Sequence, residues 1–398
     1  MSPRSIEARI EPSALLWARL AAGYDINEVS KKIGVDESLI EHWESGEKRP
    51  TLAKARRLAD IYKRPVAAFY LQQQPEIPVS PTDFRTLPAD TEQQLRYYSP
   101  QLILSIRKSR KLLSDAKRLL DLSPDYSRSG TIPTASIEEN PIEAADRLRD
   151  SLNVPIETQS RWKDSREAFD RWAGVLQNQG VLVTQMRGVP LDEARAYSIV
   201  DDPLAAIAVN PKDSWNARVF SIFHEYSHIA LGQLGVCDLY EALEAGPAGS
   251  QIEVFCNRVS GFILMPVQDI LSTPEVRAIE RAGMWDDRQV IRLARRYNVS
   301  FEAVLRQLQL VDLISYQSYM QKRAELQETF RGIKKKKATG GPSPAVKTVL
   351  DNGLFFTSLV LDNLSDNRIT LAEVSDLLGV RLKHLDRIED LVSKKRQT

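Results

Sequence analysis

The sequence predicts a mostly α-helical protein that contains one small mixed α+β domain. Apolar residues recur at near-helical spacing through most of the 398 residues. Convincing strand patterns, short and rich in β-branched residues, occur only at 180–186, 196–202 and 205–210. Three strands followed by helices indicate a small α+β domain between helical parts.

Composition narrows the class of protein. Hydrophobic residues make up 42% of the chain, and 54 basic residues nearly balance 53 acidic ones. The net charge of +1 gives no overall field toward nucleic acid or membrane, so any basic surface must be local. Two cysteines, Cys237 and Cys256, exclude a disulfide scaffold and fit a reducing compartment. Because no apolar run reaches the ~18 residues of a membrane span and residues 1–20 lack a signal peptide's apolar core, we expect a cytoplasmic protein without membrane contact.

Changes in pattern along the chain predict five parts. Residues 75–88 are Pro-rich and 334–344 are basic with glycine and proline, which is typical of linkers. Helical patterns occupy 91–121, 141–153 and 164–179. The predicted parts are a helix-turn-helix domain, a linker with a connecting helix, an α+β domain, a basic linker and a helical C-terminal module, at 1–74, 75–136, 137–332, 333–344 and 345–398.

Residues 26–50 have the spacing of two helices joined by a tight turn. Gly34 supplies the turn, Asp36 is the expected N-cap of the second helix, and Gly46 ends that helix. The apolar residues expected to face inward are Val29, Ile33, Ile40 and Trp43.

This pattern resembles the XRE (Cro/repressor-like) family through most of residues 13–70. The turn Gly34-Val35 and the tail W-E-x-G-x-x-x-P, which ends at Pro50, carry the resemblance. It implies operator DNA as a partner, contacted by outward residues of the second helix and flanking basic residues: Lys31, Lys32, Glu37, Ser38, Glu41, His42, Lys48 and Arg49. Carboxylates repel phosphate, and residues 1–75 carry 12 basic against 10 acidic residues. A helix bundle that binds protein instead of DNA therefore stays an alternative.

The strongest motif is H-E-x-x-H at residues 224–228, in the apolar segment FSIFHEYSHIAL. Residues i and i+4 lie only ~40° apart around a helix axis, so His224 and His228 can bind one zinc ion through neutral imidazoles. Glu225 lies ~60° from His228 on the same side and can deprotonate a zinc-bound water. Tyr226 projects nearly opposite, towards the core, and receives no catalytic role.

A catalytic zinc site has three protein ligands and one open position, so the motif needs a third ligand. Glu253 precedes a segment whose apolar residues fit a helix packed on the first: Val254, Val259, Phe262 and Ile263. Glu244 is a weaker rival. Cys237 and Cys256 are also potential ligands and would indicate a closed structural site, although both suit small apolar packing positions better.

The stretch R-V-F-S-I-F-H-E-Y-S-H, followed by E-x-x-x-N-R-x-x-x-x-x-L-M-P, resembles the ImmA/IrrE family of metallopeptidases. The likeness covers about residues 140–320. It implies a zincin-like α+β domain, Zn²⁺ as cofactor and Glu253 as the third ligand, and Asn257 matches the next position of the pattern. The chain departs from the family's pattern at three positions that are expected to affect packing: Cys256, Ser260 and Gly261.

Other roles around the predicted zinc site stay open. A peptidase needs a group that stabilises the tetrahedral oxyanion, for which Tyr197, Tyr240 and Arg218 are candidates. Asp238 and Glu241 are candidates to accept the Nδ1 protons of the ligand histidines.

The C-terminal half contains two further helix–turn–helix patterns, at 289–308 and 370–389. The first lies in an arginine-rich segment that forms either a substrate- or DNA-facing surface or a solvated helix face: Arg288, Arg292, Arg295, Arg296 and Arg306. Residues 334–398 carry 12 basic against 8 acidic residues. We expect a docking or dimerisation module here, which makes a homodimer a candidate assembly.

Two functions follow from these motifs. The first is a regulatory zinc endopeptidase in which Glu225 activates the water and activity can be latent. The family resemblance implies a protein substrate, namely a helix-turn-helix repressor or an operon neighbour, often beside a prophage, mobile element or stress operon. The second is a DNA-binding transcriptional regulator or antitoxin-like protein whose zinc domain senses or binds a partner. An intact base favours the enzyme, because a binding site needs only its ligands.

Overall fold

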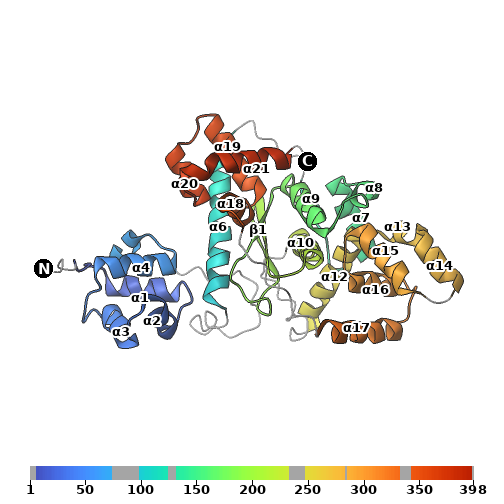
Figure 1. The fold of residues 1–398 in the computed structure, drawn as a ribbon, viewed down its shortest axis with the longest axis horizontal. Helices are drawn as coiled ribbons and strands as arrows, with labels where there is room; N and C mark the ends of the chain where they lie inside the picture. Colours follow the sequence, from blue (N-terminus) through green and yellow to red (C-terminus); the bar gives the residue numbers. More distant parts are fainter. Residues whose placement is uncertain are drawn as a thin grey trace. The chain divides into compact units, whose positions relative to one another are not determined.

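The structure, a computed structural model, describes residues 6–73, 98–123, 131–232, 247–282, 285–331 and 342–396. It is mostly helical with one three-stranded sheet, which confirms the predicted fold class (Figure 1). The chain divides into two compact units, Met1–Lys108 and Ser109–Thr398. Among the described helices, none is long and apolar enough to span a membrane. The predicted linker at 75–88 and most of the basic linker lie outside the described residues.

The first unit is a helical bundle formed by α1 (Pro12–Leu20), α2 (Ile26–Ile33), α3 (Glu37–Ser45), α4 (Leu52–Tyr62) and the 3₁₀ helix η1 (Val66–Tyr70).

Local signals in the sequence set the boundaries of α2 and α3. α2 begins with a reciprocal cap between Asp25 and Glu28 and ends at Gly34, whose φ is +69°. Asp36 is the N-cap residue of α3, but its side chain makes no capping hydrogen bond, unlike the prediction. Gly46, with φ +85°, ends α3 as predicted. The predicted inward residues of both helices are buried: Val29, Ile33, Ile40 and Trp43.

Helix α6 (Pro100–Asp121) spans the boundary between the units. Its predicted apolar stripe is buried at every position: Leu102, Ile106, Leu112, Leu113 and Leu119. In the second unit, the Ser109 hydroxyl lies 2.9 Å from the Tyr197 hydroxyl, and Lys117 forms an ion pair with Asp201.

The sheet of the second unit matches the three predicted strands. β1 (Val181–Gln185) pairs in parallel with β3 (Leu204–Val209), which pairs antiparallel with β2 (Ala196–Asp201). The strand order is therefore β1-β3-β2. Nearly all strand residues are buried, because helices cover both faces.

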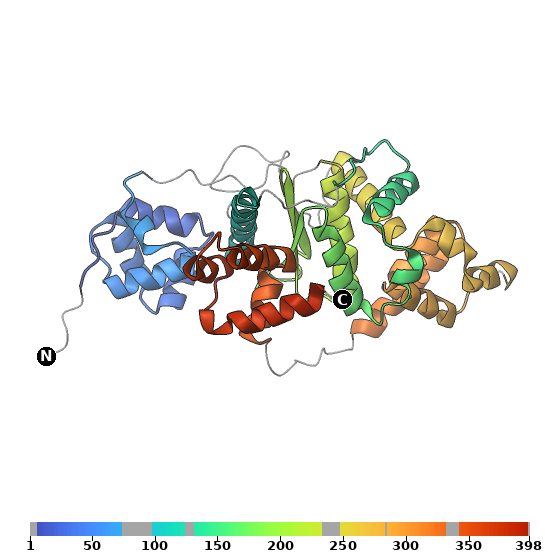
Figure 2. The same ribbon diagram turned by 90° about the horizontal axis from the view of Figure 1, so that it is seen from above.

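Helices α9 (Ser165–Gln177) and α10 (Trp215–Ala230) cover one face of this sheet (Figure 2). On the other side, α18 (Pro344–Asn352) and α19 (Leu354–Ser365) pack against β1. The module continues with α20 (Leu371–Leu378), the 3₁₀ helix η2 (Leu382–His384) and α21 (Leu385–Arg396).

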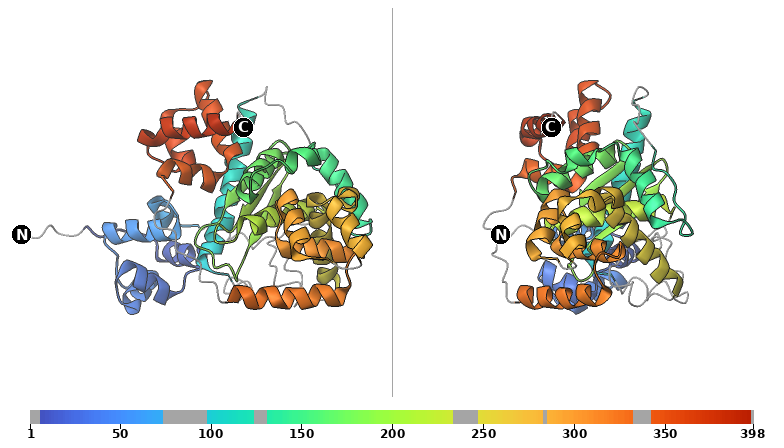
Figure 3. Two further views of the ribbon diagram at one scale, coloured as in Figure 1. Left: turned by 45° about the vertical axis from the view of Figure 1, so that its right-hand side comes forward. Right: turned by 90° about the vertical axis from the view of Figure 1, so that its right-hand side faces the viewer.

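Helix α12 (Pro247–Leu264) packs on α10 and on α7 (Pro141–Leu152), which is followed by α8 (Ile156–Gln159). Beyond α12, away from the sheet, lie the remaining helices (Figure 3): α13 (Val267–Ser272), α14 (Pro274–Ala282), α15 (Asp287–Tyr297), α16 (Phe301–Leu310) and α17 (Tyr316–Arg331). One continuous apolar core joins the sheet to these helices. This core fixes α10 and α12 side by side.

Candidate metal centre

Helix α10 is buried along most of its length between the sheet and α12. Its first turn is capped by Ser214, whose hydroxyl accepts a hydrogen bond from the Ala217 amide at 3.3 Å. On the core side, Phe223 meets the ring of Trp172 edge-on at 4.8 Å. The Tyr226 hydroxyl donates to Gln179 Oε1 at 2.6 Å, so Tyr226 lies in the core as the sequence predicts.

The opposite side of α10 presents His224 and His228 to Glu253 of α12. His224 Nε2 lies 3.1 Å from one Glu253 oxygen, and His228 Nε2 lies 3.2 Å from the other. The two Nε2 atoms are 3.2 Å apart. These three side chains form a group of potential metal ligands, and each residue as a whole is less than a tenth exposed.

The donor set fits a small divalent cation better than it fits hydrogen bonds alone. Around a tetrahedral zinc ion with bonds of ~2.0–2.1 Å, neighbouring donors lie about 3.3–3.4 Å apart, close to the separations here. If both rings donated protons to Glu253, their N–H groups would face each other across 3.2 Å. A cation removes this conflict, because it takes a lone pair from each ring.

The charges of the group also favour a cation. Burial raises the pKa of Glu253, but hydrogen bonds from the two histidines outweigh burial and hold that pKa well below its usual range. Glu253 is therefore ionised, as a metal ligand must be.

Glu225 lies next to this group and is 1% exposed. Burial raises its pKa to about 7, while the charge of His224 and the nearby Ser198 hydroxyl of β2 act in the opposite direction. A carboxyl group with a pKa near neutrality suits proton transfer in both directions.

Asn257 is a residue of this site to which sequence reasoning gave no role. It lies one helical turn after Glu253, and its side chain acts on His224 closely enough to raise the pKa of that imidazole. His224 Nδ1 is buried and has no hydrogen-bond partner, and an amide beside a ligand ring can fix the ring's orientation and its tautomer. The E-x-x-x-N spacing is the signal that places Glu253 and Asn257 on one face of α12.

The C-terminal end of α12 is held by three buried side chains from other helices. Its last carbonyls have no partner within the helix. The carbonyl of Ile263 accepts from Arg149 of α7 at 2.6 Å, that of Leu264 from Gln159 of α8 at 3.0 Å, and that of Met265 from Gln307 of α16 at 3.0 Å.

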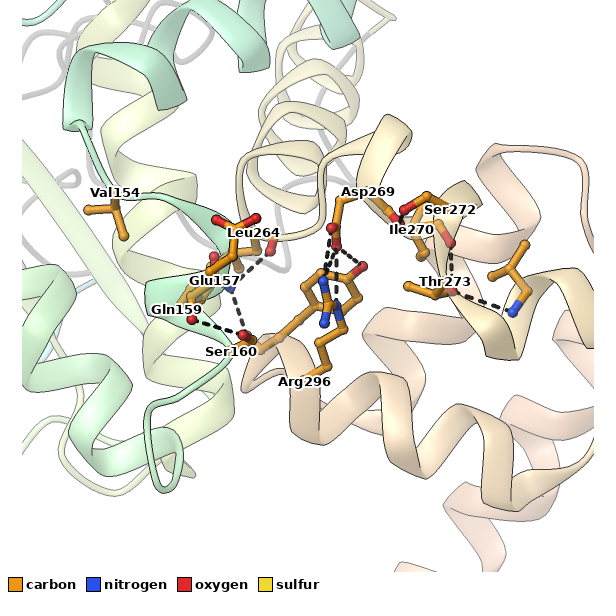
Figure 4. A network of polar contacts seen from close by, with 12 residues as sticks. Val154, Glu157, Gln159, Ser160, Leu264, Asp269, Ile270, Ser272, Thr273 and Arg296 are labelled. Carbon is orange, nitrogen blue, oxygen red and sulfur yellow. Dashed lines mark hydrogen bonds and ion pairs between the residues drawn. The ribbon is translucent and has the colours of Figure 1, made fainter.

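Figure 4 shows Gln159 reaching Leu264, beside a second polar cluster around Asp269. Asp269 accepts from Arg296 at 2.9 Å and from the Tyr297 hydroxyl at 2.5 Å. Gln159 also donates to the Tyr297 carbonyl at 3.0 Å, which connects the end of α12 to α15. Arg292 also pairs with Glu275 at 2.8 Å. Two of the five predicted surface arginines, Arg292 and Arg296, therefore form ion pairs within the domain.

The departures from the family's pattern on α12 have a packing explanation. A Cβ atom at Gly261 would lie 2.9 Å from Gln307 Oε1, so glycine leaves room for that side chain. Ser260 donates to the Cys256 carbonyl at 2.6 Å, and Cys256 is buried in the apolar core. Val254 was predicted to pack on the first helix, but it is 39% exposed. Glu253 faces α10, so the next residue along α12 points away from α10.

The candidates for oxyanion stabilisation are engaged elsewhere. Arg218 donates to the carbonyls of Pro211 and Asp213 and lies over the Trp215 ring. The Tyr197 hydroxyl pairs with Ser109, as described above. The remaining candidates for this role and for the ligand shell lie outside the described residues: Cys237, Asp238, Tyr240, Glu241 and Glu244.

In the first unit, the predicted DNA-contacting residues lie on and around α2 and α3. His42 is partly buried and pairs with Glu47 at 3.2 Å. The others are exposed: Lys31, Lys32, Glu37, Ser38, Glu41, Lys48 and Arg49. Two of these exposed residues, Glu37 and Glu41, place carboxylates on the surface of α3.

Models of known protein families match the chain in two places. Residues 15–69 match a family described as helix-turn-helix, and residues 177–309 match the IrrE N-terminal-like domain, a peptidase family. The chain joins these two domains. The second match contains the whole donor group together with Glu225. A search of the curated proteins finds no match.

Proposed function

We propose that this helix-turn-helix and IrrE-like protein is a regulatory zinc endopeptidase. The observation that carries the proposal is the convergence of His224, His228 and Glu253 within 3.2 Å, beside the buried carboxyl of Glu225. Two imidazoles, one carboxylate and an adjacent general base are the donor set of a catalytic zinc site. Membership of a peptidase family supports the same reaction.

Each residue has a separate task in this proposal. His224, His228 and Glu253 would hold the ion, which supplies Lewis acidity when it is bound. Glu225 takes a proton from the attacking water and returns it to the leaving amine, for which its pKa of about 7 is well matched. Asn257 keeps the His224 ring in place.

We propose a helix-turn-helix repressor as the protein substrate. The attached helix-turn-helix domain supports this choice, because it can pair with a related domain or bind the DNA that a repressor occupies. The acidic residues exposed on α3, Glu37 and Glu41, favour the pairing with protein over strong DNA binding by this domain alone.

Zinc content and cleavage together test the proposal. Wild type, Glu225→Gln and His224→Ala would be assayed for zinc per chain and for cleavage of repressors encoded nearby. Glu138→Gln, on the surface, is the matched control. We expect zinc in all but His224→Ala, and cleavage by wild type and the control only.

The contrary outcomes separate the alternatives. Absence of zinc from wild type refutes the ligand set. Zinc with cleavage unaffected by Glu225→Gln refutes the role of the base. Zinc without cleavage of any repressor favours a DNA-binding regulator or antitoxin-like protein with a sensory metal site.

A further inference from the structure

The C-terminal helices α19 and α20, followed by η2 and the first turn of α21, repeat the sequence pattern of α1, α2 and α3. Residues 360–388 align with residues 15–43 without insertion or deletion. In this alignment the following pairs are buried in both segments: Leu15 and Val360, Ala18 and Asn363, Tyr24 and Ile369, Val29 and Val374, Ile33 and Leu378, Ile40 and Leu385, Trp43 and Ile388.

The turn between the second and third helices is built from the same contacts. Gly34 and Gly379 both adopt left-handed backbone, with φ +69° and +63°. The Ser30 hydroxyl donates to the Val35 carbonyl at 2.8 Å, and the Ser375 hydroxyl donates to that of Val380 at 2.8 Å.

The beginning of the second helix agrees as well. Asp25 with Glu28, and Thr370 with Glu373, form the same reciprocal capping box. Shared caps, turn and buried pattern define a helix-turn-helix unit rather than an arbitrary helix pair. The matches to family models end at residue 309, so neither covers this segment.

The two units differ in the charge of the third helix. Where the first unit has Asp36, Ser38 and His42, the C-terminal unit has Arg381 just before η2, Lys383 within η2 and Arg387 in the first turn of α21. The acidic position of Glu41 is kept as Asp386, which is also exposed. All three basic side chains are exposed, and none forms an ion pair or side-chain hydrogen bond within the described part of the chain. By contrast, Lys395 and Arg396 near the end of α21 pair with Asp170 and Asp362.

We propose that residues 354–396 form a second helix-turn-helix unit that binds duplex DNA through Arg381, Lys383 and Arg387. In such units the beginning of the third helix enters the major groove, and the corresponding segment here is η2 with the first turn of α21, where these residues lie. Helices α18 and α19 hold the unit against β1. Three unpaired basic side chains at the groove-reading positions match a polyanion better than a second copy of the same surface, and the exposed carboxylate of Asp386 lies beside them as Glu41 does in the first unit. This inference does not rest on the proposed protease activity.

The test measures binding of the full chain to a fluorescent mixed-sequence duplex by anisotropy, over a series of KCl concentrations. The variant replaces Arg381, Lys383 and Arg387 with Gln. A control removes the same charge from exposed positions of α15 and α16: Arg288, Arg295 and Arg306. A third variant replaces basic residues of the first unit with Gln: Lys31, Lys48 and Arg49. Every substituted side chain is exposed, so we expect all variants to fold, and thermal melts check this.

We expect the first variant alone to raise Kd by at least ~10-fold at 0.1 M salt, and to lower the slope of log K against log salt by roughly 2–3, because each lost phosphate contact removes about 0.9. Unchanged Kd and slope overturn the proposal, as does equal loss in the α15–α16 control. A complete loss of binding in the first-unit variant alone assigns DNA to that unit instead. A change only in sedimentation behaviour assigns the surface to dimerisation and also overturns the proposal.

Discussion

Replacing Gln159 with Met tests whether the carbonyl contacts at the end of α12 stabilise the domain. Gln159 is fully buried, and its amide donates to the carbonyls of Leu264 and Tyr297, both at 3.0 Å. Methionine has a similar length and no donor, so both carbonyls would lose this partner. Leaving a buried acceptor without a partner costs about 1–3 kcal/mol. The two carbonyls together cost ~2–6 kcal/mol, and removal of the buried Gln159 Oε1, which has no partner, returns about 1–3 kcal/mol. We therefore expect a net loss of ~1–3 kcal/mol, which corresponds to roughly 2–12 °C in Tm for a large unit.

Thermal and urea unfolding of the full chain would measure this loss. Gln321→Met is the control, since Gln321 is exposed and its contact with Glu325 is long, at 3.5 Å. Surface substitutions of this kind change stability by only about 0.5 kcal/mol. If Gln159→Met melts with the control, the carbonyl contacts do not stabilise the domain and our account of α12 is wrong.

Four further outcomes follow. Removal of zinc with a chelator is expected to lower Tm in wild type but not in His224→Ala, because a ligand at 1,000 times its Kd contributes about 4 kcal/mol; equal shifts in calorimetry would contradict this. Glu225→Gln should lower kcat of repressor cleavage by roughly 10²–10⁴-fold with zinc retained, and full activity would remove Glu225 from the mechanism. Asn257→Ala should weaken zinc binding ~10–100-fold in a competition titration, whereas a structural residue would leave it unchanged. Gly353→Ala should destabilise the chain by at least about 1–3 kcal/mol in urea unfolding, because Gly353 has φ +82° and a Cβ there would lie 2.7 Å from the Val183 carbonyl oxygen; unchanged stability would mean that α18 and α19 do not need this close approach.

The parts of the site that lie on one helix could be predicted from the sequence. The spacing of His224 and His228 places both rings on one side of α10, whatever the rest of the chain does. Glu253 belongs to another helix, and only the resemblance to a family singled it out. The geometry of α12 also explains the wrong expectation for Val254: with Glu253 facing α10, the next residue is rotated about 100° toward solvent.

Contacts between distant segments could not be predicted. Arg149, Gln159 and Gln307 approach the end of α12 from three different helices, and a buried glutamine has no periodic signature in a sequence. The strand order β1-β3-β2 is equally hidden, because three short apolar strands allow several orders. Turns and caps are local, which is why the helix–turn–helix patterns at 26–44 and 370–389 were visible beforehand.

The contacts that fix α10 and α12 relative to each other are separate from the proposed metal ligands. The donor atoms lie in the C-terminal half of α10 and in the first half of α12, whereas the carbonyl contacts lie at the far end of α12. The core and these contacts therefore set the distance between the two helices without help from an ion. A site built this way holds its ligands near the separations that a tetrahedral ion requires before the ion arrives, so little ordering is needed on binding. In the proposed mechanism, the same rigidity would keep Glu225 beside the ion, where proton transfer requires it.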